Sequence, residues 1–122
     1  MKKSIFTLAL VLGVFVSAYA QNAETIKLNQ TPGAFEQTEL TLKAGTPYVF
    51  EITNQGVDHK VGFVVAPTGK TDAANHVKEA YVANAIKDGE TSQSKEVVLE
   101  AGEYVYFCPL NPTPQYKITV TK

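Results

Sequence analysis

This 122-residue sequence contains one cysteine and two histidines, and its only methionine is the initiator Met1. The cysteine and the histidines are therefore its candidate ligands for a soft metal. Cys108 ends an alternating apolar run and is followed by Pro109. His59 closes a polar turn that begins at Asn54, just past another strand-like segment. A thiolate from a strand end and an imidazole from a separate loop are ligands typical of copper. Cys108 and His59 are therefore the candidates for half of a copper site.

The same inventory excludes several classes of protein. Zinc sites built from several thiolates and internal disulfides both need at least two cysteines. All eleven basic residues are lysines and the net charge is -1, which argues against a nucleic-acid partner. No Ser/His/Asp trio, carboxylate pair or phosphate loop stands out, and a cysteine at a strand end lacks the helix dipole that activates many nucleophilic thiols. We therefore expect no enzyme.

Residues 1–20 have the pattern of an export signal. Lys2 and Lys3 give a positive start, Ile5 to Val16 is an almost unbroken apolar run, and Ala18-Tyr19-Ala20 is a small-x-small cleavage pattern before Gln21. The run is shorter than the roughly 20 apolar residues that cross a bilayer. We expect a periplasmic or secreted protein with no membrane anchor in its mature chain.

The mature chain, residues 21–122, is predicted to be a single domain made mostly of strands. Nine lysines face twelve acidic residues in it, so its net charge is -3. The strand-like segments are 25–29, 39–43, 48–53, 61–65, 96–100, 104–108 and 116–120, separated by Gly- and Pro-containing turns. Residues 72–87 instead carry apolar side chains at helical spacing, with Thr71 or Asp72 as a possible N-cap. The pattern predicts an all-β sandwich or barrel with one short helical insertion at about residues 72–87.

Several of these segments together resemble the cupredoxins, the small blue-copper family that includes plastocyanin. The matching parts are the turn Lys43-Ala44-Gly45, the strand 48–53 with Asn54 leading to His59, and the run 101–108 with the closing strand 117–120. The resemblance covers most of the mature chain and is weakest over 72–87. It implies a Greek-key β-sandwich of the cupredoxin type, with a role in electron transfer or copper handling. It also implies that His59 is the first histidine ligand and Cys108 the thiolate ligand.

The loop after Cys108 departs from the family pattern, in which a second histidine and then a methionine follow the cysteine. Asn111 stands three positions after Cys108 and Thr113 five positions after it, and the loop 109–115 is short. Asn111 is a poor replacement for an imidazole, because a neutral amide oxygen is a hard, weak donor for copper. Gln115 could replace the axial methionine, since glutamine serves in that place. The candidate metal ligands are thus His59 and Cys108, with Gln115 and Asn111 as the weaker donors.

Two hypotheses of different classes follow. In the first, His59 and Cys108 bind copper as Cu(I), which tolerates two or three soft ligands, and the partner of this monomeric protein is a redox or copper-transfer protein. In the second, the chain is a metal-free scaffold that binds a protein partner, Cys108 is a buried small side chain and His59 a surface residue. His76 is expected either to be a partly buried histidine satisfied by hydrogen bonds or to serve as the replacement ligand.

Overall fold

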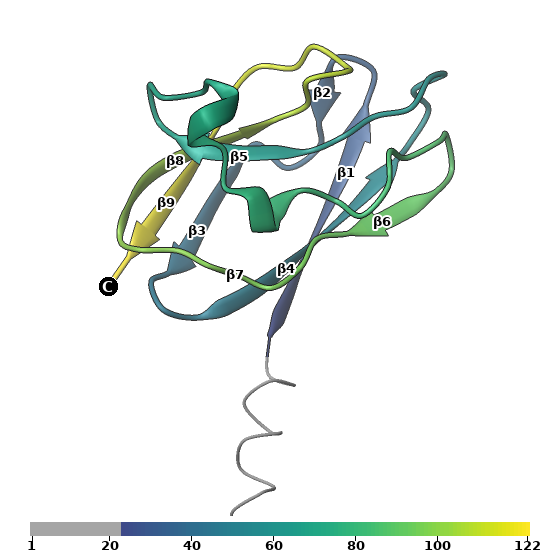
Figure 1. Cartoon of the computed structure of the whole chain (residues 1–122). Coiled ribbons are helices and arrows are strands. Elements are labelled where there is room, and N and C mark those ends of the chain that lie inside the picture. Colours follow the sequence, from purple (N-terminus) through teal and green to yellow (C-terminus); the bar gives the residue numbers. More distant parts are fainter. Residues whose placement is uncertain (1–22) are drawn as a thin grey trace, which may run out of the picture.

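In the computed structural model, residues 23–122 fold into two β-sheets that pack against each other (Figure 1). The signal peptide expected at residues 1–20 and its cleavage before Gln21 lie outside the described residues. The all-β sandwich that the alternating pattern predicts is confirmed.

Each sheet contains one parallel pairing between strands that are distant in sequence. The first sheet has the order β2 (Ala34–Phe35), β1 (Glu24–Thr31), β4 (Pro47–Asn54), β6 (Thr91–Gln93), and β7 (Val97–Val98) also pairs with β4. The second has the order β3 (Glu39–Lys43), β9 (Tyr116–Thr121), β8 (Gly102–Phe107), β5 (Val64–Pro67). β1 runs parallel to β4 and β3 parallel to β9, whereas the other pairs are antiparallel.

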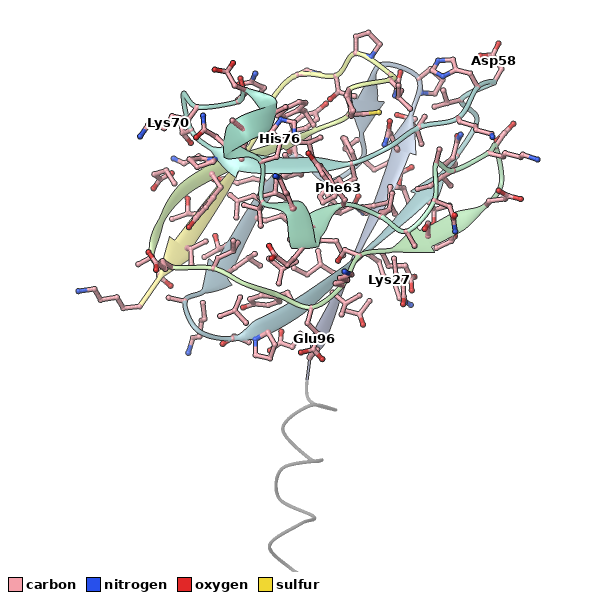
Figure 2. The ribbon with its side chains drawn as sticks, in the orientation of Figure 1. Lys27, Asp58, Phe63, Lys70, His76 and Glu96 are labelled. Carbon is pink, nitrogen blue, oxygen red and sulfur yellow. The ribbon has the colours of Figure 1, made fainter. Side chains whose placement is uncertain are left out.

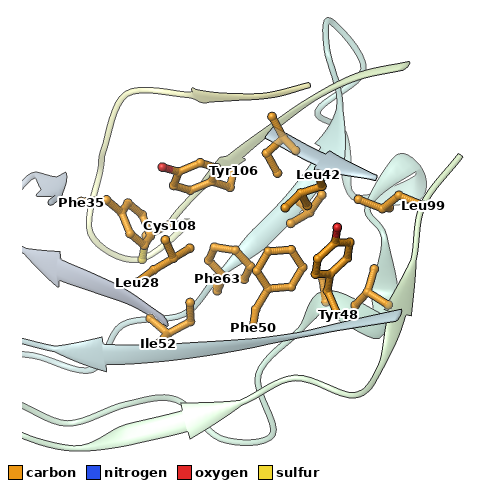
Figure 3. Packing of buried hydrophobic residues seen from close by; sticks show 14 of the residues in the cluster. Leu28, Phe35, Leu42, Tyr48, Phe50, Ile52, Phe63, Leu99, Tyr106 and Cys108 are labelled. Carbon is orange, nitrogen blue, oxygen red and sulfur yellow. The ribbon is translucent and has the colours of Figure 1, made fainter. Parts of the chain in front are cut away.

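The core between the sheets follows the period of two in the sequence. On β4 the side chains of Tyr48, Phe50 and Ile52 are buried while their neighbours are only half-buried. Phe50 meets Phe63 with the ring centroids 5.1 Å apart, and the ring of Phe63 in turn lies 6.0 Å from that of Tyr106 (Figure 3). This rigid core fixes the strand ends from which the candidate ligands project.

The expected helical insertion at residues 72–87 is present only as two 3-10 turns, η1 (Ala73–Asn75) and η2 (Lys78–Ala80). The backbone between and after these turns makes hydrogen bonds to residues outside the segment. Val77 N–H donates to Val65 O at 2.8 Å, and Val61 and Ile86 exchange two backbone hydrogen bonds. Asp72 makes no side-chain cap. Tertiary backbone pairing has thus overridden the helical spacing of the apolar residues.

Other differences concern short or polar strands. The strand expected at 61–65 lies at Val64–Pro67, and the one expected at 96–100 is reduced to Val97–Val98. β2 and β6 were not expected, because two residues and a polar Thr-Ser-Gln run give no alternating apolar signal. None of the helices within residues 23–122 has the length and apolar character needed to traverse a membrane.

Candidate functional site

Cys108 lies directly after β8 and is almost fully buried, with 3% of its surface exposed. Its side chain belongs to the hydrophobic cluster, and Figure 3 shows it among Leu28, Phe35 and Tyr106. The thiol is free, since no second cysteine exists in the sequence. Burial of an unpaired cysteine at a strand end agrees with its behaviour as a small apolar side chain.

The sulfur of Cys108 accepts hydrogen bonds from three backbone N–H groups. Asn111 N–H donates at 3.1 Å, and Leu110 and Gly62 each donate at 3.3 Å. Two donors belong to the loop that follows Cys108, where the prolines at 109, 112 and 114 have no N–H to give. The third donor, Gly62, comes from the segment that follows His59. The two loops of the candidate site therefore meet at the sulfur.

The side chain of Asn111 bonds to the β1–β2 hairpin and not to the sulfur. It is 5% exposed. Its Oδ1 accepts the Gly33 N–H at 2.9 Å, and its Nδ2 donates to Gln30 Oε1 at 3.0 Å and to Thr31 O at 2.9 Å. Each atom of the amide thus has a partner, so the residue at the family's second-histidine position is already engaged.

Gln30 also belongs to the polar network near Cys108, although it is not among the candidate residues predicted from the sequence. It is fully buried, and its Nε2 donates to Gly62 O at 3.0 Å while its Oε1 accepts from Asn111. A signal for it was available. Gln30 follows Leu28 on the inward face of β1, so a polar side chain occupies a position where the alternation requires an apolar one.

His59 is exposed, in a loop whose shape is set by Asn54. The fully buried Asn54 Nδ2 donates to His59 O at 3.1 Å and also to Val57 O and Ile86 O, while its Oδ1 accepts the Val57 N–H at 2.9 Å. The ring Nδ1 of His59 lies 3.0 Å from Lys60 O and donates to it in the matching tautomer, which leaves Nε2 as the nitrogen for a ligand. The turn signal Asn54-Gln55-Gly56 is confirmed as the base of this loop.

The two remaining candidates make no hydrogen bond to the sulfur, although the ring of His76 lies 6.1 Å from that of Phe107, the residue before Cys108. Gln115 is exposed, just before β9. His76 is half-buried, with its ring Nδ1 2.7 Å from Tyr81 Oη and its Nε2 2.9 Å from Thr71 O. Both ring nitrogens of His76 therefore have partners, which confirms the expectation of a histidine satisfied by hydrogen bonds. Figure 2 shows His76 beside η1, apart from the loop that carries Asp58.

Tyr106, on β8 and two residues before Cys108, packs against other aromatic rings. Tyr106 is fully buried and its hydroxyl donates to Gln37 O, while its ring lies 5.4 Å from that of Tyr116. Burial, and to a smaller extent the charge of Tyr116, raises the pKa of Tyr106 from 10.0 to about 12. Tyr106 is therefore a neutral, rigid part of the core at ordinary pH.

These residues do not fit a blue-copper centre, which requires two imidazoles, a thiolate and a weak axial ligand. Asn111 is held by the hairpin, Gln115 is exposed, and no group of three or more His, Cys, Asp or Glu side chains is gathered within residues 23–122. The donors that remain are one thiol and one imidazole on loops that meet. That pair suits the low coordination number of Cu(I) and not the larger ligand set of Cu(II).

Comparison with known proteins agrees with this fold. A family model described as cupredoxin-like domain matches residues 4–120. Auracyanin A, a "blue" copper protein from Chloroflexus aurantiacus, is 21% identical, with 81% of this chain and 99% of that chain covered and a TM-score of 0.66. The auracyanin of Roseiflexus castenholzii is 16% identical, with 82% and 98% covered and a TM-score of 0.65.

An enzyme is also among the similar structures. The copper-containing nitrite reductase of Thermus scotoductus is 17% identical, with 80% of this chain but 22% of that chain covered and a TM-score of 0.51. At such identities the likeness concerns the fold alone. No curated protein matches the chain.

Proposed function

The chain belongs to the cupredoxin-like domain family, and we propose that it is a copper-handling protein that binds Cu(I) through Cys108 and His59. The observation that carries the proposal is the meeting of two loops at the Cys108 sulfur, where Gly62 N–H, three residues beyond His59, donates at 3.3 Å. Asn111 and Gln115, at the family positions of the second histidine and the axial methionine, supply no imidazole and no thioether. A site limited to these two donors favours Cu(I) over Cu(II).

The backbone around Cys108 suits a metal-bound thiolate. Three N–H dipoles point at the sulfur and stabilise negative charge on it. His59 is exposed and can exchange ligands with a partner, whereas Cys108 is shielded from water. Bound Cu(I) would supply either a transferable cargo or a one-electron redox centre. Nothing in this proposal requires catalysis by the chain.

The rest of the proposal concerns where the protein works and with what. The protein acts after export to the periplasm or beyond, with residues 1–20 removed before Gln21 and no anchor in the mature chain. Its partner is a redox or copper-transfer protein that docks near the exposed His59, and the chain is a monomer. The leader-like pattern of residues 1–20 and the mildly acidic mature chain support this placement.

The test is a competition titration of the exported protein with a colorimetric Cu(I) chelator under reducing conditions. We expect one equivalent of Cu(I) to be retained by the wild type, with retention abolished in Cys108→Ala and weakened in His59→Ala. His76→Ala, which removes the other imidazole, is the matched control and should bind as the wild type does. Equal binding by Cys108→Ala would overturn the proposal.

A second function is favoured by one observation: the Cys108 sulfur accepts three backbone N–H groups, and both polar atoms of the Asn111 amide have protein partners. In this alternative the chain is a metal-free scaffold and its partner surface is the proline-rich loop, where Leu110 is 53% exposed. The same titration separates the two functions. A folded wild type that retains no Cu(I), and whose thiol reacts with reagents only on unfolding, would support the scaffold.

A further inference from the structure

Two amide side chains meet inside the protein, at the end of the sandwich that holds Cys108. Gln30 is 0% exposed and Asn111 is 5% exposed, and Asn111 Nδ2 donates to Gln30 Oε1 at 3.0 Å. Within residues 23–122 no buried side-chain nitrogen or oxygen is left without a hydrogen-bond partner. Burial of an amide is costly unless its polar atoms are paired, so each of the two amides contributes to satisfying the other.

The pair connects the Cys108 loop to the first sheet by two routes. Asn111 Oδ1 accepts the Gly33 N–H and Asn111 Nδ2 donates to Thr31 O, so its side chain binds two backbone groups of the β1–β2 hairpin. The backbone N–H of Asn111 donates to the sulfur at 3.1 Å. Gln30 Nε2 donates to Gly62 O, and Gly62 N–H donates to the sulfur. The two amides therefore support two of the three hydrogen bonds that the sulfur accepts.

We propose that Gln30 and Asn111 act as one polar lock, which holds the Cys108 loop against the β1–β2 hairpin and keeps the thiol covered when no metal is bound. Both are positioning residues, because neither side chain hydrogen-bonds to the sulfur. The inference goes beyond copper binding, since it concerns the metal-free protein and holds for either function above.

If the two amides form such a lock, removing one of them should have a local effect on the Cys108 loop, which can be distinguished from a general loss of stability. Loss of one amide should free the loop after Cys108 while the core stays folded. The other side-chain hydrogen bonds of the loop are those of Thr113, which bonds to Cys108 N–H and Pro114 O and to neither sheet. Loss of an apolar contact at the far end of the core should lower the melting temperature without exposing the sulfur. Leu99 provides that comparison, since it is buried at the end of the cluster opposite to Cys108 in Figure 3.

The experiment measures the rate at which iodoacetamide modifies Cys108 in the folded, chelator-treated protein. For Asn111→Ala and Gln30→Ala we expect the rate to rise about tenfold, the factor that loss of a buried hydrogen-bonded pair gives in a local opening equilibrium. Leu99→Ala should stay within about twofold of the wild type despite a lower melting temperature. The double variant should react little faster than either single variant, because the two amides act as a unit.

Three results would overturn the lock. The rates of Asn111→Ala and Gln30→Ala could equal that of Leu99→Ala at matched melting temperature, the two single effects could multiply in the double variant, or the sulfur could stay unreactive in both. If Asn111→Ala does not fold, Asn111→Asp serves in its place. It keeps an acceptor for Gly33 N–H and loses both donated hydrogen bonds, so the same rise in rate is expected.

Discussion

Cys108 shows at the scale of a single residue how this chain differs from a blue-copper protein. Its sulfur has three backbone donors, and the position that would supply the second imidazole holds an amide bonded elsewhere. The backbone N of that residue, Asn111, is 3.1 Å from the sulfur. A larger ligating side chain at this position would therefore begin close to a copper ion bound to Cys108. A substitution at Asn111 therefore tests the missing ligand directly.

We predict that Asn111→His gains an intense visible thiolate-to-copper band on addition of Cu(II), which the wild type lacks. The metal-free variant should also melt on the order of 10 °C lower than the wild type, because three buried hydrogen bonds of the amide are lost. Asn84→Ala, at an exposed asparagine, is the control for stability. A natively folded Asn111→His protein that stays colourless with Cu(II) would show that the loop is wrongly aligned with the family.

Tyr106 gives a prediction for pH. Its folded pKa of about 12 lies above the ordinary 10.0, so the folded state favours the protonated phenol. Stability from this group is complete below about pH 10 and is lost as pH rises toward 12, by on the order of 2 kcal/mol in total. Urea unfolding at increasing pH should show this fall, and its size should shrink in Tyr106→Phe. An equal fall in Tyr106→Phe would assign the effect to other groups.

The candidate site was predictable from residue type and spacing only in part. Cys108 and His59 stand out because thiols and imidazoles are rare in the sequence and follow strand ends. The state of Asn111 could not be predicted, because its partners are about 80 residues away in the chain. Gln30 was overlooked for the same reason, although its polar side chain on the inward face of β1 is a signal of a buried network.

At the scale of elements, the loop between β4 and β5 is organised by one buried asparagine. Asn54 ends β4 and bonds to the backbone of Val57, His59 and Ile86. It therefore joins the His59 loop to the segment that precedes β6. The Asn54 side chain thus helps to determine where the candidate imidazole of His59 lies.

Asn54→Ala should accordingly lower the free energy of unfolding by about 2–4 kcal/mol, because several buried backbone groups lose their partner at once. Cu(I) affinity should also fall, although both candidate ligands remain. Chemical denaturation and the chelator titration measure the two effects, with Asn75→Ala, at an exposed asparagine in η1, as the control. Unchanged Cu(I) affinity in a destabilised Asn54→Ala protein would remove His59 from the proposed site.

The segment 72–87 shows where reasoning from local patterns fails. Its apolar residues have helical spacing, but Val77 bonds to Val65 on β5 and Ile86 bonds to Val61. Two 3-10 turns are what remains of the helix. A pattern within the segment carries no information on these partners, because Val65 and Val61 lie outside it and become available only when the sandwich forms.

At the scale of the whole molecule, the sequence predicted the two-sheet architecture but not its pairing. Alternation in β4 indicated a strand with one buried face, and Gly- and Pro-containing turns separated the other strands. The parallel pairs β1–β4 and β3–β9 depend on contacts between distant segments and were not predicted. The fold thus places Cys108 and His59 on loops that meet, whereas the ligand set differs from that of blue copper.

Copper is proposed to be held here as Cu(I) by one thiolate and one imidazole. X-ray absorption at the copper edge, recorded on the exported protein loaded with one equivalent of Cu(I), tests this claim most directly. We predict a Cu(I) edge and a first shell of one sulfur and one imidazole nitrogen. A shell with two imidazoles, a shell without sulfur, or a protein that loses its copper on desalting would contradict the claim.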